Sequence, residues 1–183
     1  MSYNLRNMIF PFSVLILFSC RIKTKLNTSE LKWMNVYSVN DTLIFKSQRG
    51  DFDTSIIIKK DLFCPEYNPV EQHGKYLPQW GVVWYKNKNL IYHPDGDRLI
   101  TMEKTSKKKT FLVINYLYTG FMFLDITTDS LKKYKKTGVY EFNTEVSRPD
   151  ALQPKQIFWD EKYGIVRYKT HSNDVWERVN LPK

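Results

Sequence analysis

From residue 33 onward, short runs rich in β-branched and aromatic residues alternate with turn signals, and this regular spacing most constrains the fold. The runs recur at intervals of roughly 8 to 12 residues, as they do in antiparallel sandwiches and barrels. Clusters such as Asn40-Asp41 and Asp95-Gly96 separate them, and these residues tolerate the positive φ angles of tight hairpins. The pattern therefore predicts an all-β fold.

We expect residues 33–183 to form a single antiparallel domain of roughly ten to twelve short strands, as a half-barrel, a barrel or a sandwich. The 183-residue chain has the length of one domain, and its aromatic share of 15% favours strands. At most one short helix is expected, over Thr128–Lys136, where Leu131 and Tyr134 share a face. The expected strands are Asn35–Val39, Thr42–Gln48, Thr54–Lys60, Val82–Lys86, Leu90–His93, Arg98–Lys104, Phe111–Tyr118, Phe121–Ile126, Gly138–Val146, Gln156–Trp159, Tyr163–Lys169 and Val175–Val179.

The N-terminus has the composition of a cleavable export signal. Residues 1–7 contain Arg6 and no acid, and the next twelve residues, MIFPFSVLILFS, are almost wholly apolar. A membrane-spanning helix needs about 20 apolar residues, so this run is too short to cross a bilayer. We therefore expect residues 1–19 to be a signal peptide.

The end of this segment, Leu17-Phe18-Ser19-Cys20, resembles the lipobox of bacterial lipoproteins: an aliphatic residue, a variable position, a small residue and a cysteine. The resemblance implies that the Cys20 thiol is alkylated with diacylglycerol and that a dedicated peptidase, which recognises Leu17 and Ser19, cuts before it. Two or three acyl chains, such as palmitate, hold a protein firmly on a membrane.

The same resemblance predicts where the protein resides. Arg21 stands where an aspartate is associated with retention in the inner membrane, and the basic segment RIKTK differs from acidic surface-export tags. We therefore expect a lipid-anchored protein of the cell envelope, on the periplasmic face of the outer membrane. Residues 20–32 are polar and contain no Gly or Pro, and we interpret them as the lipidated cysteine followed by a tether.

Further segments resemble a broad group of uncharacterised small lipoproteins of Gram-negative bacteria. They are Asn40–Ser47 with the following Gly50–Thr54, and the hairpin Phe158–Tyr168 with the following Trp176–Arg178. The chain departs from this group at Asn40, where the group has glycine. The resemblance implies a lipoprotein with a β domain and brings no activity with it.

Lysine-rich segments make the chain strongly basic. The formal net charge is +9, and loss of residues 1–19 removes Arg6 and no acid, which leaves +8. A surface with this charge favours anionic binding partners. The alternative is that the excess lysines are solvated on the faces of hairpins and bind no particular partner. Lys107-Lys108-Lys109 form one basic run. The second run interleaves an aromatic residue, and we interpret its lysines as candidates for contact with lipid headgroups or lipopolysaccharide: Lys132, Lys133, Lys135 and Lys136.

Residues 61–80 have no strand pattern and contain three prolines. Long irregular loops in compact domains are often functional. The aromatic and histidine side chains on this segment are candidates for gripping a ligand or a partner, and the alternative is that they plug one end of the barrel: Tyr67, His73, Tyr76 and Trp80.

Signals for catalysis are weak. The three histidines have no metal-ligand spacing, so we expect no metal and no cofactor. We interpret the acid pairs Asp51/Asp53 and Asp95/Asp97 as turn caps. With Cys20 acylated, Cys64 has no intrachain partner and is expected to be a small buried hydrophobe.

Together these features predict a membrane-anchored, non-enzymatic domain for binding or envelope support, with an envelope protein or a lipid as partner and no nucleic acid. A large apolar cavity between sheet and loop would favour a lipid ligand. The alternative is a hydrolase whose carboxylate pair assembles only in the fold, and that enzyme needs two acids within about 10 Å in one cleft. A module that binds another envelope protein is a third interpretation.

Overall fold

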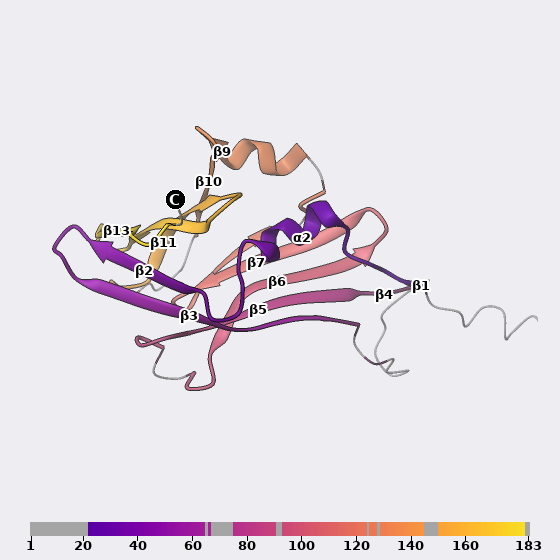
Figure 1. Cartoon of the computed structure of the whole chain (residues 1–183). Helices are drawn as coiled ribbons and strands as arrows, with labels where there is room; N and C mark the ends of the chain where they lie inside the picture. Colours follow the sequence, from indigo (N-terminus) through magenta and orange to yellow (C-terminus); the bar gives the residue numbers. More distant parts are fainter. Residues whose placement is uncertain are drawn as a thin grey trace, which may run out of the picture.

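The computed structural model describes residues 22–64, 66, 75–90, 93–123, 125–127, 129–144 and 150–181. Eleven strands form one antiparallel sheet in the order β8-β7-β6-β5-β3-β2-β13-β12-β11-β10-β9 (Figure 1). The strands are β2 (Thr42–Ser47), β3 (Phe52–Phe63), β5 (Gln79–Asn87), β6 (Asp97–Ser106), β7 (Lys109–Tyr116), β8 (Thr119–Phe123), β9 (Lys135–Lys136), β10 (Val139–Asn143), β11 (Pro154–Asp160), β12 (Gly164–Thr170) and β13 (Val175–Arg178).

Four short elements complete the fold. Strand β1 (Ile22–Lys23) pairs in parallel with β4 (Tyr76–Leu77) in a separate two-stranded sheet. The α-helix α2 covers Thr28–Asn35, and the 3-10 helix η2 covers Asp129–Tyr134. No helix in the described part of the chain has the length and apolar character to span a membrane.

The expected all-β antiparallel domain is confirmed, as a sheet that curls into a half-barrel. The expected strand Asn35–Val39 is wrong, because Asn35 ends α2 and a turn follows it. Leu90 and His93, the ends of another expected strand, have no strand structure, and residues 91–92 lie outside the described residues. The helical segment expected over Thr128–Lys136 is a 3-10 helix followed by β9.

Helix α2 fills the trough of the curled sheet. Met34 is fully buried and faces Gly81 in β5. The ring centroid of Trp33 lies 5.2 Å from that of Tyr140 in β10 and 5.4 Å from that of Trp159 in β11. One helical turn therefore contacts both halves of the sheet. Burying each such side chain stabilises the fold by roughly 1.5–3 kcal/mol. A Cβ atom at Gly81 would lie 2.3 Å from the Met34 sulfur, so the approach of the helix requires glycine there.

The helix begins at a capping box. The Asn27 side chain accepts the backbone N–H of Glu30 at 2.9 Å, and the Glu30 carboxylate accepts that of Asn27 at 2.8 Å. Thr24 and Leu26, just before the cap, are buried. The polar segment that we interpreted as a tether up to residue 32 is therefore, from Thr24 on, part of the packed domain.

Glu30 also ties the helix to the sheet through a buried ion pair. Its second carboxylate oxygen accepts hydrogen bonds from the Lys104 ammonium group in β6 and from the Thr110 hydroxyl in β7, the latter at 2.6 Å. The side chains of Glu30 and Lys104 are only 3% and 5% exposed. A buried pair of this kind adds little net stability over an apolar pair, but loss of one partner leaves the other charge uncompensated.

We expect Lys104→Met to lower the free energy of unfolding by about 3–5 kcal/mol, because it strands the Glu30 carboxylate in the interior. The double variant Glu30→Gln/Lys104→Met should be more stable than the sum of the single changes predicts. Urea denaturation of the four proteins of this cycle measures the coupling. Additive effects of the two substitutions would contradict a coupled ion pair.

Candidate functional site

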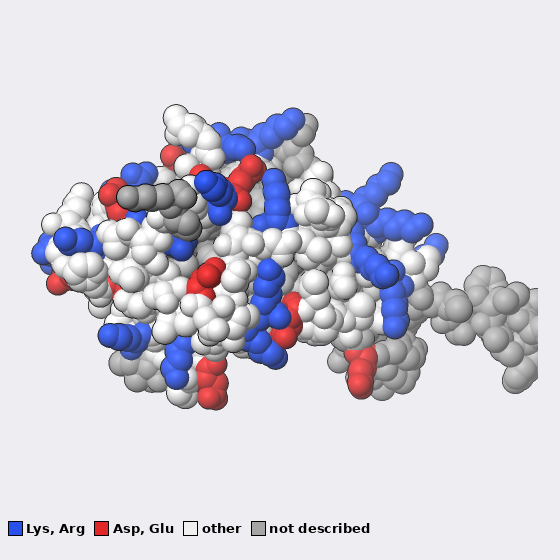
Figure 2. All heavy atoms as spheres, viewed as in Figure 1, with Lys and Arg blue, Asp and Glu red and all other residues white. Residues whose placement is uncertain are grey.

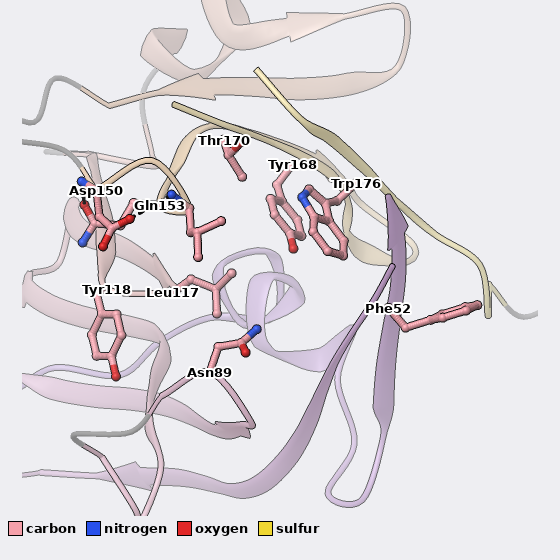
Figure 3. A pocket seen from close by; sticks show the side chains of 10 residues that line it. Phe52, Asn89, Leu117, Tyr118, Asp150, Gln153, Tyr168, Thr170 and Trp176 are labelled. Atoms are coloured by element: carbon pink, nitrogen blue, oxygen red, sulfur yellow. Dashed lines mark hydrogen bonds between the residues drawn. The ribbon is translucent and has the colours of Figure 1, made fainter. Parts of the chain in front are cut away.

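A pocket of about 360 Å³ opens at one end of the half-barrel (Figure 3). It is surrounded by the β2–β3 hairpin, the β7–β8 turn, the turn before β11, the end of β12 and the start of β13. A volume of this size suits a small ligand. The lining residues are Phe52, Asn89, Leu117, Tyr118, Asp150, Leu152, Gln153, Tyr168, Thr170 and Trp176.

Two aromatic rings form one wall of the pocket. Tyr168 and Trp176, on the neighbouring strands β12 and β13, stack with ring centroids 5.7 Å apart and planes only 7° apart. Figure 3 shows the two rings side by side, with Leu117 and Asn89 opposite them, whereas Phe52 extends away from the group. Tyr168 is only 1% exposed, so the half-buried Trp176 ring is the aromatic surface of this pair that a ligand can contact, beside the amide groups of the lining.

The polar groups of the lining are amides, a hydroxyl and one carboxylate. Gln153 and Asp150 are hydrogen-bonded within one turn: the Asp150 backbone N–H donates to the Gln153 side-chain oxygen at 3.2 Å. Thr170 and Asn89 complete the polar set, and the lining contains no lysine or arginine among its described residues. In a chain of net charge +9, this pocket therefore lacks the cations that an anionic ligand would need.

A buried carboxylate lies behind the pocket wall. Asp53 of β3 is 2% exposed and accepts four side-chain hydrogen bonds. The hydroxyls of Tyr116 and Tyr168 donate to one oxygen at 2.9 and 3.0 Å, and the amides of Asn87 and Asn89 donate to the other at 2.8 and 3.2 Å. These donors offset the cost of burying the charge. Because Tyr168 and Asn89 also line the pocket, Asp53 orders two of its walls.

Burial and the charge of the Asp53 carboxylate keep Tyr116 and Tyr168 protonated. Burial raises the pKa of Tyr116 well above its usual value, and the nearby Asp53 carboxylate raises it further. The pKa of Tyr168 is raised by the same two causes. Both hydroxyls therefore remain hydrogen-bond donors to Asp53 over the whole physiological pH range.

The β7–β8 turn at the pocket is strained. Leu117 and Tyr118 are the two loop residues of this hairpin, with φ angles of 47° and 64°. Two-residue turns with positive φ strongly favour Asn and Gly, since a side chain in the left-handed region costs about 1–2 kcal/mol. Strain of this kind persists where the surroundings or a function require the side chain. Tyr118 is one of the residues that line the pocket, and its ring centroid lies 5.8 Å from that of His93.

Five of the residues expected to function lie outside the described residues: Leu17, Ser19, Cys20, Tyr67 and His73. Tyr76 lies in β4, and Trp80 lies in β5 with its ring stacked on Phe63, 6.4 Å between centroids. Both belong to the end of the sheet opposite the pocket. Strand β3 runs on to Phe63 and β5 begins at Gln79, so the irregular segment is shorter than the sequence predicted.

The lysines of the second basic run lie on η2 and β9, away from the pocket. Lys135 and Lys136 pair with Glu161 and Glu141 at 3.4 and 2.8 Å. Hydrogen bonds from Tyr140 and from Lys32, together with Lys135, lower the pKa of Glu161 to about 2. The Lys133 ammonium nitrogen lies over the Tyr134 ring, 4.8 Å from its centroid. This run therefore carries less free positive charge than its sequence suggests.

Most other polar candidates have structural roles. Asp51 lies in the β2–β3 hairpin turn, but the side chain that caps the backbone there is Ser47, whose hydroxyl oxygen accepts the N–H groups of Arg49 and Asp51 at 3.1 and 3.0 Å. The turn interpretation is wrong for Asp53, which is the buried strand residue described above. The described residues contain no group of three or more His, Cys, Asp or Glu side chains that could hold a metal ion. Cys64 is a free, half-buried thiol.

The pocket and its buried acid were missed from the sequence, although one signal pointed to the acid. Asp53, Ser55 and Ile57 alternate with exposed or half-buried residues, so the two-residue period of a strand places Asp53 on the inner face. The partners that satisfy it lie 63 and 115 residues further along the chain, at Tyr116 and Tyr168. Only the fold brings them together.

No protein-family model matches this chain, and neither a curated protein nor a solved structure does.

We expect Asp53→Asn to destabilise the protein by roughly 2–4 kcal/mol, because an amide replaces one acceptor oxygen with a donor that faces other donors. Tyr168→Phe should cost less, about 1.5–3 kcal/mol, since it removes a single bond to the charge. Asp51→Asn, two residues away in an exposed turn, is the matched control. Equal denaturation midpoints for the two Asp→Asn variants would contradict the role assigned to the buried carboxylate.

Proposed function

We propose that this chain is a lipid-anchored binding protein of the cell envelope, whose pocket takes a small neutral ligand with several hydroxyl groups, such as a saccharide. Acyl chains on Cys20 supply the anchor, and the domain supplies the binding site. The observation that carries the binding role is the pocket itself: stacked rings of Tyr168 and Trp176 on one side, and uncharged hydrogen-bonding groups with one acid around them.

The composition of the pocket supports a neutral ligand over an anionic one. The half-buried Trp176 ring can stack on the apolar face of a sugar ring, while the side chains of Asn89 and Gln153 offer donors and acceptors for hydroxyls. Asp150 on the rim and Asp53 behind the wall disfavour phosphates and carboxylates. A saccharide satisfies these groups and brings no charge that needs compensation.

The interior of the half-barrel argues against a lipid ligand inside it. The trough that would receive an acyl chain is occupied by Trp33 and Met34 of α2 and by the aromatic residues packed on them. A role as lipid carrier would need a larger apolar cavity than the pocket of about 360 Å³. The expected lipid partner is therefore assigned to the anchor and the bilayer, not to the pocket.

Binding also fits the acids better than hydrolysis does. Asp53 already accepts four hydrogen bonds, and an Asp150 oxygen accepts the Leu152 N–H within its own turn at 3.0 Å. A general acid or base needs a free oxygen within reach of the substrate. Asp53 has no free oxygen, and Asp150 has no second carboxylate beside it among the described lining residues with which to form a hydrolytic pair.

The test is ligand-observed NMR on the wild-type protein with maltose and with N-acetylglucosamine, and with glycerol 3-phosphate and choline as charged comparisons. We expect saturation transfer to a sugar and none to glycerol 3-phosphate. Tyr118→Gly should abolish the transfer, and Leu62→Asn, an exposed apolar residue at the far end of β3, should leave it unchanged. Transfer only to a charged probe, or equal transfer in both variants, would overturn the proposal.

Tyr118→Gly has a second expected outcome that requires no ligand. Glycine relieves the left-handed strain at this turn, so the free energy of unfolding should rise by about 1 kcal/mol even though an aromatic ring is lost. Thermal denaturation measures it. Gain of stability together with loss of binding is typical of a strained functional residue. A destabilised variant would indicate that Tyr118 serves packing instead.

A further inference from the structure

The first described strand begins only two residues after Cys20. Ile22 lies in β1, where its N–H donates to the Lys75 carbonyl at 3.1 Å, and the Thr24 N–H donates to the Leu77 carbonyl at 3.0 Å. Two residues span at most about 7 Å. An acyl anchor on Cys20 therefore leaves no room for a tether, and the end of the domain that carries β1 must rest at the membrane surface.

Several strand ends meet at that end of the domain. Strand β1 pairs with β4, and the Thr24 hydroxyl accepts the Gln79 N–H of β5 at 3.0 Å. Gln79 is in register with Lys104 of β6, and Phe63 at the end of β3 is in register with Trp80. Because neighbouring strands are antiparallel, the β6–β7 turn lies at the same end.

This end is basic, and its lysines are exposed. Figure 2 shows lysine and arginine side chains gathered at the right-hand end of the molecule, over β1 and the β6–β7 hairpin of Figure 1. We call these residues the β1-end lysines: Lys23, Lys25, Lys75, Lys107, Lys108 and Lys109.

Among the described acids near these lysines, Asp125 lies within electrostatic reach of Lys109 and offsets part of its charge. Glu30 is buried against Lys104, and Asp61 pairs with Lys59 at 2.7 Å. Glu66 is exposed and leaves the β1-end lysines in clear excess. By contrast, Lys135 and Lys136 on β9 have acidic partners.

Two large apolar side chains are exposed at the same end. Leu62 and Phe63, the last residues of β3, are 50% and 45% exposed. Apolar side chains beside lysines are the combination by which a surface enters the headgroup region of an anionic bilayer: the lysines meet phosphates while the apolar groups leave water.

We propose that the β1-end lysines with Leu62 and Phe63 form a membrane-docking face for anionic phospholipid headgroups. The inference rests on the proposed anchor, since Cys20 fixes which end meets the bilayer. Acylation supplies attachment, and the docking face supplies orientation. The pocket then faces away from the membrane, because Phe52 at its rim and Phe63 at the docking face are the two ends of β3, roughly 36 Å apart.

The test uses the unacylated mature chain, residues 20–183 with Cys20→Ser, which keeps all the described elements from β1 onward. Sedimentation with phosphatidylcholine vesicles, with and without phosphatidylglycerol, measures binding without the anchor. We expect binding only to the anionic vesicles. The triple variant Lys107→Gln/Lys108→Gln/Lys109→Gln should bind anionic vesicles on the order of 100-fold more weakly, because each lysine near such a surface strengthens binding about fivefold.

The matched control is Lys132→Gln/Lys133→Gln/Lys136→Gln, which removes the same charge from the other basic run and should change binding far less. Leu62→Asn should weaken binding, while Leu152→Asn at the pocket end should not. Equal loss in the two triple variants, or no binding to anionic vesicles, would overturn the docking face. Neither acylation nor a pocket ligand enters this assay, so its outcome is independent of the proposed function.

Discussion

The buried carboxylate of Glu30 is the point on which the arrangement of this domain depends. One oxygen closes the first turn of α2, and the other receives Lys104 and Thr110 from two neighbouring strands. This fixes the helix in the trough of the curled sheet, where Trp33 packs on β10 and β11. With the helix in the trough, the pocket lined by Tyr168 and Trp176 lies at the end of the sheet where β3 begins.

The sheet could be predicted from the sequence because strands and turns are local features. Clusters such as Asn40-Asp41 mark where strands stop, and the structure has strands between most of them. Helix α2 was missed because a polar composition suggested a tether, although Asn27 and Glu30 carry the spacing of a capping box. The pocket could not be predicted, since Tyr116 and Tyr168 reach Asp53 only through long-range pairing.

The two ends of β3 lie at two different surfaces of the molecule. At one end, Asp53 orders an aromatic pocket whose described lining residues include no lysine or arginine. At the other end, Leu62 and Phe63 lie among exposed lysines and beside the start of the packed chain. In the account proposed here, a rigid sheet holds a binding site at a set height above the bilayer, and no flexible tether is needed to present it.

The most direct test is metabolic labelling with a radioactive fatty acid in a Gram-negative host, comparing the full wild-type chain with Cys20→Ser. The account predicts that the wild type takes up label and partitions into detergent, and that the variant does neither. If neither protein is labelled, Cys20 is not acylated, and the anchored orientation of the pocket is contradicted.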